Sequence, residues 1–289
     1  MKSDILITKE SDGYALLDAG DGEKLERFGD FVLHRPDPQA LFSPSAPCKS
    51  WKADAKFVRD GAKVKWEMKA DLAKSWPIPF GGLVMEIRPT SFKHTGLFPE
   101  QAVNWDFIRD TIKKSGRETV SVINLFAYTG GATLAAAQAG ADVTHVDGSK
   151  SAIEWARTNQ ELSGLSDKKI RYILEDVVLF LKREIKRGNR YDAIVMDPPK
   201  FGHGGKGEVW KIEEQFNELM NLAKDVLSDK PLFFIINGYA SGYSPLAYRN
   251  SLLSLQEKCG GTIETGELAL QQKDTDRLLP TGIFARWSK

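Results

Sequence analysis

Cysteine and histidine are scarce in this chain, with 2 and 4 respectively among 289 residues. Cys48 and Cys259 are far apart and follow no pattern, which argues against a disulfide scaffold or a cysteine-rich metal site and favours a reducing, cytoplasmic location. The histidines form neither an HxH nor an HExxH pattern, so we expect no metal site. Apolar runs stay far below the roughly 20 residues of a membrane-spanning helix, and the N-terminal segment lacks the apolar core of a secretory signal. We therefore expect no membrane association.

An excess of charge of one sign is also missing, since the formal net charge is +1. A polyanionic partner would have to bind local patches rather than the field of the whole molecule. Residues 49–74 form one such patch, because basic side chains are interleaved there with Trp51, Phe57 and Trp66. A second basic cluster consists of Lys182, Arg183, Lys186, Arg187 and Arg190. Basic and aromatic side chains together suit phosphate contacts and base stacking, and a solvated surface is the open alternative.

The pattern of apolar residues changes along the chain. In the second part, strand-like and helical segments alternate, which predicts βαβ units and a parallel sheet with helices on both faces. Seven strands are expected, at residues 120–125, 142–147, 170–174, 191–196, 231–237, 262–270 and 281–287. The last two resemble a hairpin, which suggests an antiparallel edge. We therefore expect an α/β protein, with a small β-rich domain at residues 1–98 and a Rossmann-like, seven-stranded domain at residues 99–289. Residues 97–114 predict a linking helix.

The most informative stretch is Asp192–Gly202, with the sequence DAIVMDPPKFG. A short buried strand ends at Asp197, because the two following prolines lack the N–H groups that a sheet needs. Ligands of open α/β sheets bind outside the carboxyl ends of the strands, so this rigid turn is a candidate site. Asp197 can accept a hydrogen bond from a base, Phe201 can stack on an extruded base, and Lys200 can contact phosphate. Core packing of Phe201 and a solvated Lys200 are the alternatives.

A glycine-containing loop, NLFAYTGGAT at residues 124–133, follows the first expected strand and precedes a helix. Gly130 and Gly131 let the backbone turn tightly, and the helix presents its electropositive N-terminus. The three-glycine GxGxxG pattern of dinucleotide binding is absent. This loop therefore favours a cofactor with one carboxylate and no phosphates over NAD.

Acidic residues stand at the ends of further strands. Asp147 follows the second strand, where a carboxylate can accept both hydroxyls of a ribose. Asp176 follows the third strand, where it can meet an adenine amino group. Either residue alone is more often a helix N-cap, but together with Asp197 they indicate a site for a nucleoside cofactor.

These motifs resemble those of the class I S-adenosylmethionine-dependent methyltransferases, over about residues 80–289. The pair FAYTGG and DPPKF, preceded by Gly96–Gln101, is most similar to the branch that methylates bases of large-subunit ribosomal RNA. The resemblance implies S-adenosylmethionine as cofactor, RNA as substrate, and a monomer or homodimer. It places around the cofactor Asn124, Phe126, Ala127, Tyr128, Thr129, Gly130, Asp147, Ser149, Asp176 and Asp197. It places at the methyl group Asp197, Pro198, Pro199 and Lys200, with Phe201 and Asn237 on the substrate side.

Two departures from that branch narrow the chemistry. Asn124 stands where many members carry an acid, so it can hydrogen-bond without charge. Relatives that methylate C5 of cytosine use a cysteine after the fifth strand, where this chain has IINGYASGY at residues 235–243. We therefore expect a nitrogen or oxygen acceptor, with nitrogen favoured, and a glycine-rich loop at residues 202–210 that closes over the substrate. A protein or small-molecule substrate, and a module that has lost cofactor binding, remain alternatives.

Overall fold

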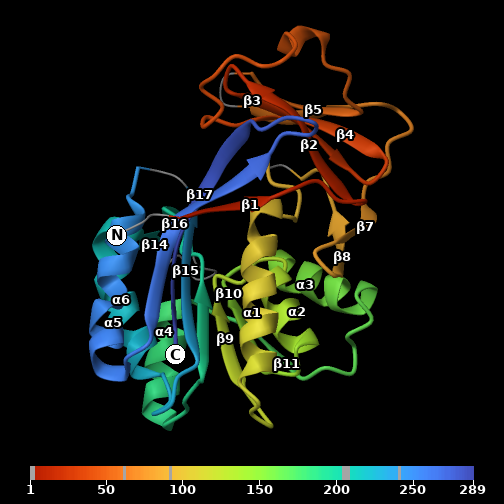
Figure 1. Cartoon of the computed structure of the whole chain (residues 1–289). Coiled ribbons are helices and arrows are strands. Elements are labelled where there is room, and N and C mark those ends of the chain that lie inside the picture. The colour runs from red at the N-terminus through yellow and green to blue at the C-terminus, as the bar shows by residue number, and fades with distance from the viewer. Residues whose placement is uncertain (1–3, 61–62, 91–92, 204–208, 240–241) are drawn as a thin grey trace. The chain divides into compact units, whose positions relative to one another are not determined.

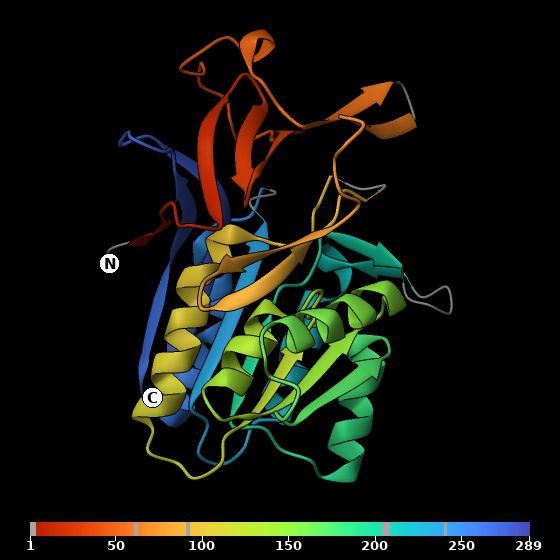
Figure 2. The same cartoon turned by 90° about the vertical axis from the view of Figure 1, so that its right-hand side faces the viewer.

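The computed structural model of this chain describes residues 4–60, 63–90, 93–203, 209–239 and 242–289. It divides into two compact units (Figures 1 and 2). Unit 1 contains Met1–Ile5, Asn104–Glu267 and Gly282–Lys289, and unit 2 contains Leu6–Val103 and Leu268–Thr281. The boundary expected from the sequence, between residues 98 and 99, lies a few residues before the long segment of unit 1.

An eight-stranded sheet, in the order β1-β16-β17-β15-β12-β9-β10-β11, forms the centre of unit 1. Its strands are β1 (Asp4–Thr8), β9 (Ser121–Leu125), β10 (Asp142–Asp147), β11 (Ile170–Leu174), β12 (Ala193–Met196), β15 (Phe233–Tyr239), β16 (Thr262–Gln271) and β17 (Leu278–Ser288). The strands β11, β10, β9, β12 and β15 are parallel, and β17 pairs antiparallel with β15. This confirms the predicted α/β architecture. The expected count of seven strands is wrong by one, because the short N-terminal strand β1 extends the sheet beyond β16.

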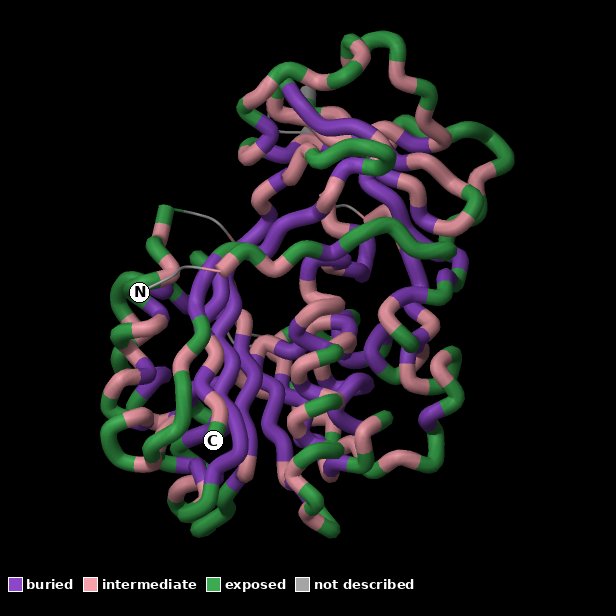
Figure 3. Tube along the Cα trace, viewed as in Figure 1, coloured by how far each residue is buried: buried purple, intermediate pink, exposed green. Residues whose placement is uncertain are grey.

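Apolar side chains cover the sheet on both faces, which explains why its strands are continuous apolar runs. Along β12, Ile194 and Met196 pack into a cluster with residues of α4, α5 and α6, whereas Ala193 and Val195 pack on the opposite face with residues of α1 and α2. Figure 3 shows the strands as the buried centre of the fold. The helices are α1 (Ala102–Lys114), α2 (Gly131–Gln138), α3 (Lys150–Leu162), α4 (Val177–Arg187), α5 (Ile212–Asp225) and α6 (Pro245–Cys259).

Two segments differ from their predicted form. The linking helix begins with a 3-10 turn at Pro99–Gln101, so that α1 itself starts at Ala102. The ends of the glycine-rich loop pair as an antiparallel ribbon of β13 (Phe201–His203) and β14 (Val209–Lys211). The predicted closure of this loop over a substrate concerns residues 204–208, which lie outside the described residues.

Unit 2 is β-rich, as predicted. Its five-stranded sheet follows the order β2-β3-β4-β5-β6, and β7 and β8 form a separate pair. The bounds are β2 (Tyr14–Gly20), β3 (Glu23–Phe28), β4 (Phe31–Pro36), β5 (Ala55–Asp60), β6 (Lys63–Met68), β7 (Trp76–Phe80) and β8 (Leu83–Ile87), with a 3-10 turn at Cys48–Ser50. The pairs within this unit are antiparallel except for β4 and β5, which are parallel. The long connection between them returns the chain to the end of the sheet at which β4 begins.

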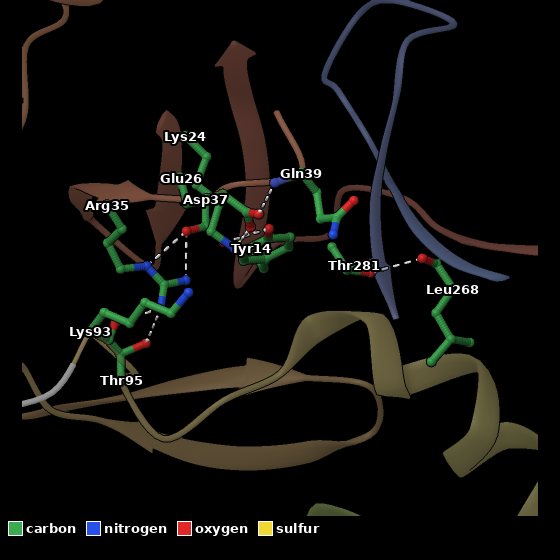
Figure 4. A network of polar contacts seen from close by, with 10 residues as sticks. All are labelled: Tyr14, Lys24, Glu26, Arg35, Asp37, Gln39, Lys93, Thr95, Leu268 and Thr281. Carbon is green, nitrogen blue, oxygen red and sulfur yellow. Dashed lines mark hydrogen bonds and ion pairs between the residues drawn. The ribbon is translucent and has the colours of Figure 1, made fainter. Parts of the chain in front are cut away.

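A buried network of charges lies inside unit 2 (Figure 4). The carboxylate of Glu26 accepts hydrogen bonds from the Tyr14 hydroxyl at 2.9 Å and from Nε of Arg35 at 2.9 Å. Burial alone would raise the pKa of Glu26, but Arg35 and Lys24 outweigh it and hold that pKa below its usual value. Arg35 also donates to the carbonyl of Lys93 at 3.0 Å. The network therefore ties the segment before α1 to β3 and β4.

No helix in the described part of the chain is both long enough and apolar enough to cross a bilayer.

Candidate cofactor and acceptor site

The loop between β9 and α2 has an unusual backbone. Phe126 and Tyr128 adopt left-handed conformations, with φ of 55° and 48°, and Gly130 follows at 89°. Bulky residues rarely occupy this region, and each such conformation costs about 1–3 kcal/mol and persists only where its surroundings hold it in place. The sequence predicted a tight turn at Gly130 and Gly131, whereas in the structure positive φ angles occur at Phe126, Tyr128 and Gly130. Strain of this kind clusters at ligand-binding sites.

Asp147, at the end of β10, holds this loop in place. One carboxylate oxygen, Oδ2, accepts the N–H of Tyr128 at 2.8 Å, and Oδ1 accepts the N–H of Ser149 at 2.8 Å. Burial raises the pKa of Asp147, and these two hydrogen bonds oppose that rise. A carboxylate oxygen has two lone pairs, so each oxygen can accept a further hydrogen bond from a hydroxyl group.

The loop is also fixed from the helix side. Asn159 of α3 donates from Nδ2 to the carbonyl of Thr129 at 2.9 Å, and Ala127 donates its N–H to Val146 at 3.1 Å. Gly130 packs closely, because a Cβ atom there would lie 3.1 Å from the Cβ of Ala156. The predicted residues from Phe126 to Gly130 therefore form one rigid turn at the N-terminus of α2.

Asn124 lies beneath this loop in a buried polar network. Its Nδ2 donates to Oγ1 of Thr133 at 3.0 Å, and that hydroxyl lies 2.9 Å from Nδ1 of His145. Burial lowers the pKa of His145 to about 3, so the ring is neutral at physiological pH. An ionised acid in place of Asn124 would be a buried charge without a cationic partner, which is costly. This environment explains the amide at this position.

Ser149 and Asp176 both cap helices, and for Asp176 this is the alternative that its position before a helix suggested. Oγ of Ser149 accepts the N–H of Ala152 at 3.3 Å at the start of α3. Oδ1 of Asp176 accepts the N–H of Leu179 at 2.9 Å at the start of α4. Capping leaves Oδ2 of Asp176 available, so its contact with an adenine stays a prediction.

Asp197 is the most distinctive group of the acceptor side. It is half-buried, and burial raises its pKa to about 6. Among the residues that the structure describes, none donates a hydrogen bond to this carboxyl. Met196 pairs with Leu125 on one side and with Ile236 on the other. Asp197 therefore follows β12 at the same sheet edge as the cofactor loop and Asn237.

The remaining residues of the proline turn differ in exposure. Pro198 is buried, whereas Pro199 and Lys200 are exposed. Nζ of Lys200 lies 3.9 Å from Glu213, whose carboxylate also accepts the Tyr243 hydroxyl at 2.5 Å. Lys200 is thus exposed and has an acidic neighbour, and its contact with a phosphate stays a prediction.

Phe201 is 54% exposed, which excludes the alternative of core packing. It pairs with Lys211 across the β13–β14 ribbon. The exposed phenyl ring lies close to Asp197 in the chain, and its stacking on a base stays a prediction.

Trp210 is a site residue that sequence analysis missed. Its indole Nε1 donates to the carbonyl of Pro199 at 2.6 Å, and its ring lies 5.2 Å from that of Phe126, measured between centroids. The side chain is buried, with 5% exposure. Trp210 therefore joins the proline turn to the cofactor loop. It could have been recognised in the sequence as a large apolar residue inside a segment of glycines and charged residues.

Replacing Trp210 with Phe keeps an aromatic ring against Phe126 but removes the hydrogen bond to Pro199. We expect kcat for methyl transfer to fall about fivefold to tenfold, because a net hydrogen bond of about 1 kcal/mol no longer fixes the proline turn. Steady-state kinetics on the methyl-accepting substrate measures this. The matched control is Trp287→Phe, which removes an indole hydrogen bond to the Gly260 carbonyl (2.7 Å) at the opposite end of the strands, where Trp287 pairs with Phe234 of β15. Equal kcat values for both variants would contradict the role of Trp210.

The two basic clusters are less available than their sequence suggests. In the cluster at residues 182–190, Lys182 pairs with Glu218 at 2.7 Å and Arg183 pairs with Glu175 at 2.5 Å. In residues 49–74, Phe57 and Trp66 pack edge to face against each other at 5.4 Å. Some charges and rings of these clusters therefore already have partners within the fold, although the side chains of Lys182 and Arg183 stay about half exposed. No group of three or more potential metal ligands occurs among the described residues.

Known proteins resemble this chain over most of its length. The family model of the S-adenosylmethionine-dependent methyltransferases matches residues 53–244. The crystal structure of an S-adenosylmethionine-dependent methyltransferase from Agrobacterium tumefaciens is 39% identical, with a TM-score of 0.92, over 99% of this chain and 93% of that chain. Ribosomal RNA large subunit methyltransferase I of Klebsiella pneumoniae strain 342 is 44% identical over 214 residues, 68% of this chain and 50% of that protein.

A further relative is ribosomal RNA large subunit methyltransferase K of Neisseria meningitidis serogroup B, which is 32% identical over 151 residues. The match covers 51% of this chain and 41% of that protein. The chain thus spans about half the length of these curated relatives, or less. The family model covers more than half of the chain, and the A. tumefaciens structure matches nearly all of it. The chain therefore belongs to the S-adenosylmethionine-dependent methyltransferases, which confirms the family and the cofactor that its motifs predicted.

Proposed function

We propose that this protein is a cytoplasmic enzyme, a monomer or homodimer, that methylates a nitrogen atom of a base in ribosomal RNA. The observation that carries the proposal is Asp197, a half-buried carboxyl with a pKa of about 6 and no hydrogen-bond donor from any described residue. A carboxylate in this state is ready to accept a hydrogen bond from the N–H of a substrate. The ribosomal RNA specificity named for the two curated relatives supports RNA as the substrate.

The residues around the glycine loop fit S-adenosylmethionine. Asp147 has oxygen lone pairs to accept the ribose hydroxyls, and the electropositive N-terminus of α2 suits the carboxylate of the cofactor. Asp176 keeps one oxygen for an adenine amino group. When bound, the cofactor supplies a methyl group carried on a sulfonium. Because this cofactor has no phosphate groups, it needs no phosphate-binding loop, in agreement with the absence of the GxGxxG pattern.

Positioning is the main task of the acceptor residues. Methyl transfer to nitrogen is an in-line displacement, and alignment of the reacting atoms can contribute about 7–11 kcal/mol. Asp197 holds the substrate nitrogen through its N–H and takes up the proton that this nitrogen loses. Pro198 and Pro199 fix the direction of the turn, since proline restricts the backbone. Phe201 stacks on the base, and Lys200 contacts a nearby phosphate.

The proposal is tested by methyl transfer from labelled S-adenosylmethionine to ribosomal RNA from a strain that lacks this gene. We expect label in the large-subunit RNA, and none when Asp197 is replaced by Ala. Total protein from the same strain is the control substrate, because a protein side chain could occupy the same proline turn. Label in protein but in no RNA would contradict the proposal.

A further inference from the structure

A buried hydrogen bond links the start of α1 to the end of β15. Nδ2 of Asn104 donates to Oδ1 of Asn237 at 3.0 Å, across 133 residues of sequence. Both side chains are buried, with 1% and 3% exposure. Asn104 of α1 thus fixes the carboxamide of Asn237, which lies near the carboxyl end of β15, on the side of the acceptor site.

This bond determines which part of Asn237 is left for a ligand. A carboxamide carries its oxygen on one side and its NH₂ group on the other. Because Asn104 uses the oxygen, Asn237 keeps two N–H donors for its other side. Among the described residues, none accepts a hydrogen bond from these two N–H groups.

Asn237 and Asp197 both follow the last paired residues of β12 and β15. Ile236 pairs with Met196, at which β12 ends, so Asn237 and Asp197 are the next residues along the two chains. Paired residues of adjacent parallel strands point to the same face, and the strands are about 4.8 Å apart. Asn237 lies on the face of α1, where Asn104 donates to it, and Val195, two residues before Asp197, packs on the same face with Ile108 and Ile112. A donor group therefore lies beside the carboxylate of Asp197, which can only accept when ionised.

We infer that Asn104 is a positioning residue that orients Asn237, so that the acceptor site presents an NH₂ donor beside the Asp197 acceptor. This rests on the proposed function and specifies its substrate. The complementary ligand is a base edge on which an N–H stands beside an unprotonated ring nitrogen or a carbonyl. The Watson–Crick edges of the bases have this pattern. The N7 edge of guanine presents two acceptors and does not match, and neither do base carbons or ribose oxygens.

Asp197 and Asn237 have separate roles in the transfer of the methyl group. The lone pair of the substrate nitrogen forms the new bond to the methyl carbon as the methyl–sulfur bond breaks, and the bonding electrons stay on sulfur. The proton of that nitrogen passes to the carboxylate of Asp197. Asn237 meanwhile donates to the neighbouring acceptor atom of the base and keeps the edge in register with Asp197.

The test uses Asn104→Ala, Asn237→Ala and the double variant in the RNA methylation assay. We expect each single change to lower kcat at least about tenfold, which corresponds to one well-placed hydrogen bond. The double variant should be no worse than Asn237→Ala within about twofold, because Asn104 acts through Asn237 and coupled residues are not additive. Affinity for S-adenosylmethionine and the melting temperature report whether the fold is intact. Asn250→Ala, on the exposed surface of α6, is the control.

A second variant tests the orientation itself. The change Asn104→Asp replaces a hydrogen-bond donor by a carboxylate, which only accepts hydrogen bonds when ionised. It therefore turns the NH₂ group of Asn237 toward α1 and the oxygen of Asn237 toward the substrate. We expect this variant to lose more activity than Asn104→Ala. Multiplicative losses in the double alanine variant, or equal activity of the two position-104 variants, would overturn the inference.

Nucleoside analysis of the methylated RNA separates this inference from the proposed function. A methyl group on an exocyclic amine or on a ring nitrogen that carries hydrogen supports both. A methyl group on guanine N7, on a base carbon or on a ribose oxygen overturns the inference while RNA remains the substrate. Absence of any label in RNA overturns the proposed function, and the inference with it.

Discussion

Replacing Asp197 with Asn is expected to lower kcat for methyl transfer by about 10²–10⁴-fold, the usual range for the loss of a positioned proton acceptor. Asn keeps the size of the side chain but cannot take up the proton of the substrate nitrogen. Affinity for S-adenosylmethionine should stay within about twofold of the wild-type value, because the cofactor loop is held by Asp147 and Asn159 rather than by Asp197. Steady-state kinetics and calorimetry measure the two effects separately. A collapse of cofactor affinity in this variant would show that the acceptor and cofactor sites are not separate.

The same residue predicts a pH dependence. Burial raises the pKa of Asp197 to about 6, so its carboxyl is protonated below that pH and cannot accept the N–H of the substrate. We expect kcat/KM of the wild-type enzyme to rise with pH up to about pH 6 and to level off above it. In the Asp197→Asn variant, kcat/KM should not show this rise with pH.

Stability should change in the opposite direction to activity. A folded-state pKa above the unfolded value means that the ionised carboxyl destabilises the fold, fully above about pH 6 and not at all below the unfolded pKa. The neutral Asn variant should therefore melt at a higher temperature than the wild type at pH 7.5, with the difference disappearing near pH 4. Equal melting temperatures at pH 7.5 would argue that Asp197 is not desolvated.

Much of the fold could be predicted because its strands alternate regularly with helices. Buried parallel strands such as β12 need apolar residues on both faces, and this leaves an unambiguous run in the sequence. The edge strand β1 is different, since Ile5 and Ile7 are more than a third exposed and the strand has only five residues. Likewise, the parallel pairing of β4 and β5 depends on the path of the connecting chain rather than on local pattern.

The candidate site could be predicted only where it follows from strand ends. Asp147 and Asp197 come directly after apolar runs, and a parallel sheet brings such positions to one edge. Trp210 and Asn104 could not be found in this way. Trp210 reaches the carbonyl of Pro199 through the pairing of β13 and β14, and Asn104 contacts Asn237, which is distant in the sequence. The left-handed backbone of the cofactor loop was also missed, since it is imposed by hydrogen bonds rather than by local preference.

Replacing Asp147 with Ala is expected to reduce affinity for S-adenosylmethionine by about 100-fold or more. The change removes the carboxylate that we propose as acceptor of the ribose hydroxyls, and hydrogen bonds to a charged group contribute about 1.5–3 kcal/mol each. It also releases the N–H of Tyr128, so that the strained turn at Phe126 and Tyr128 can relax before the cofactor binds. Calorimetry measures the affinity, and hydrogen exchange at the Tyr128 amide measures the release.

The matched control is Asp142→Ala, at the other end of the same strand, where the carboxylate forms an exposed ion pair with Lys169. We expect its cofactor affinity and its exchange at Tyr128 to equal those of the wild type. If Asp147→Ala weakens binding while the Tyr128 amide stays protected, the carboxylate contacts the ribose but does not hold the loop. Unchanged affinity would instead show that the cofactor lies elsewhere than at the carboxyl end of β10.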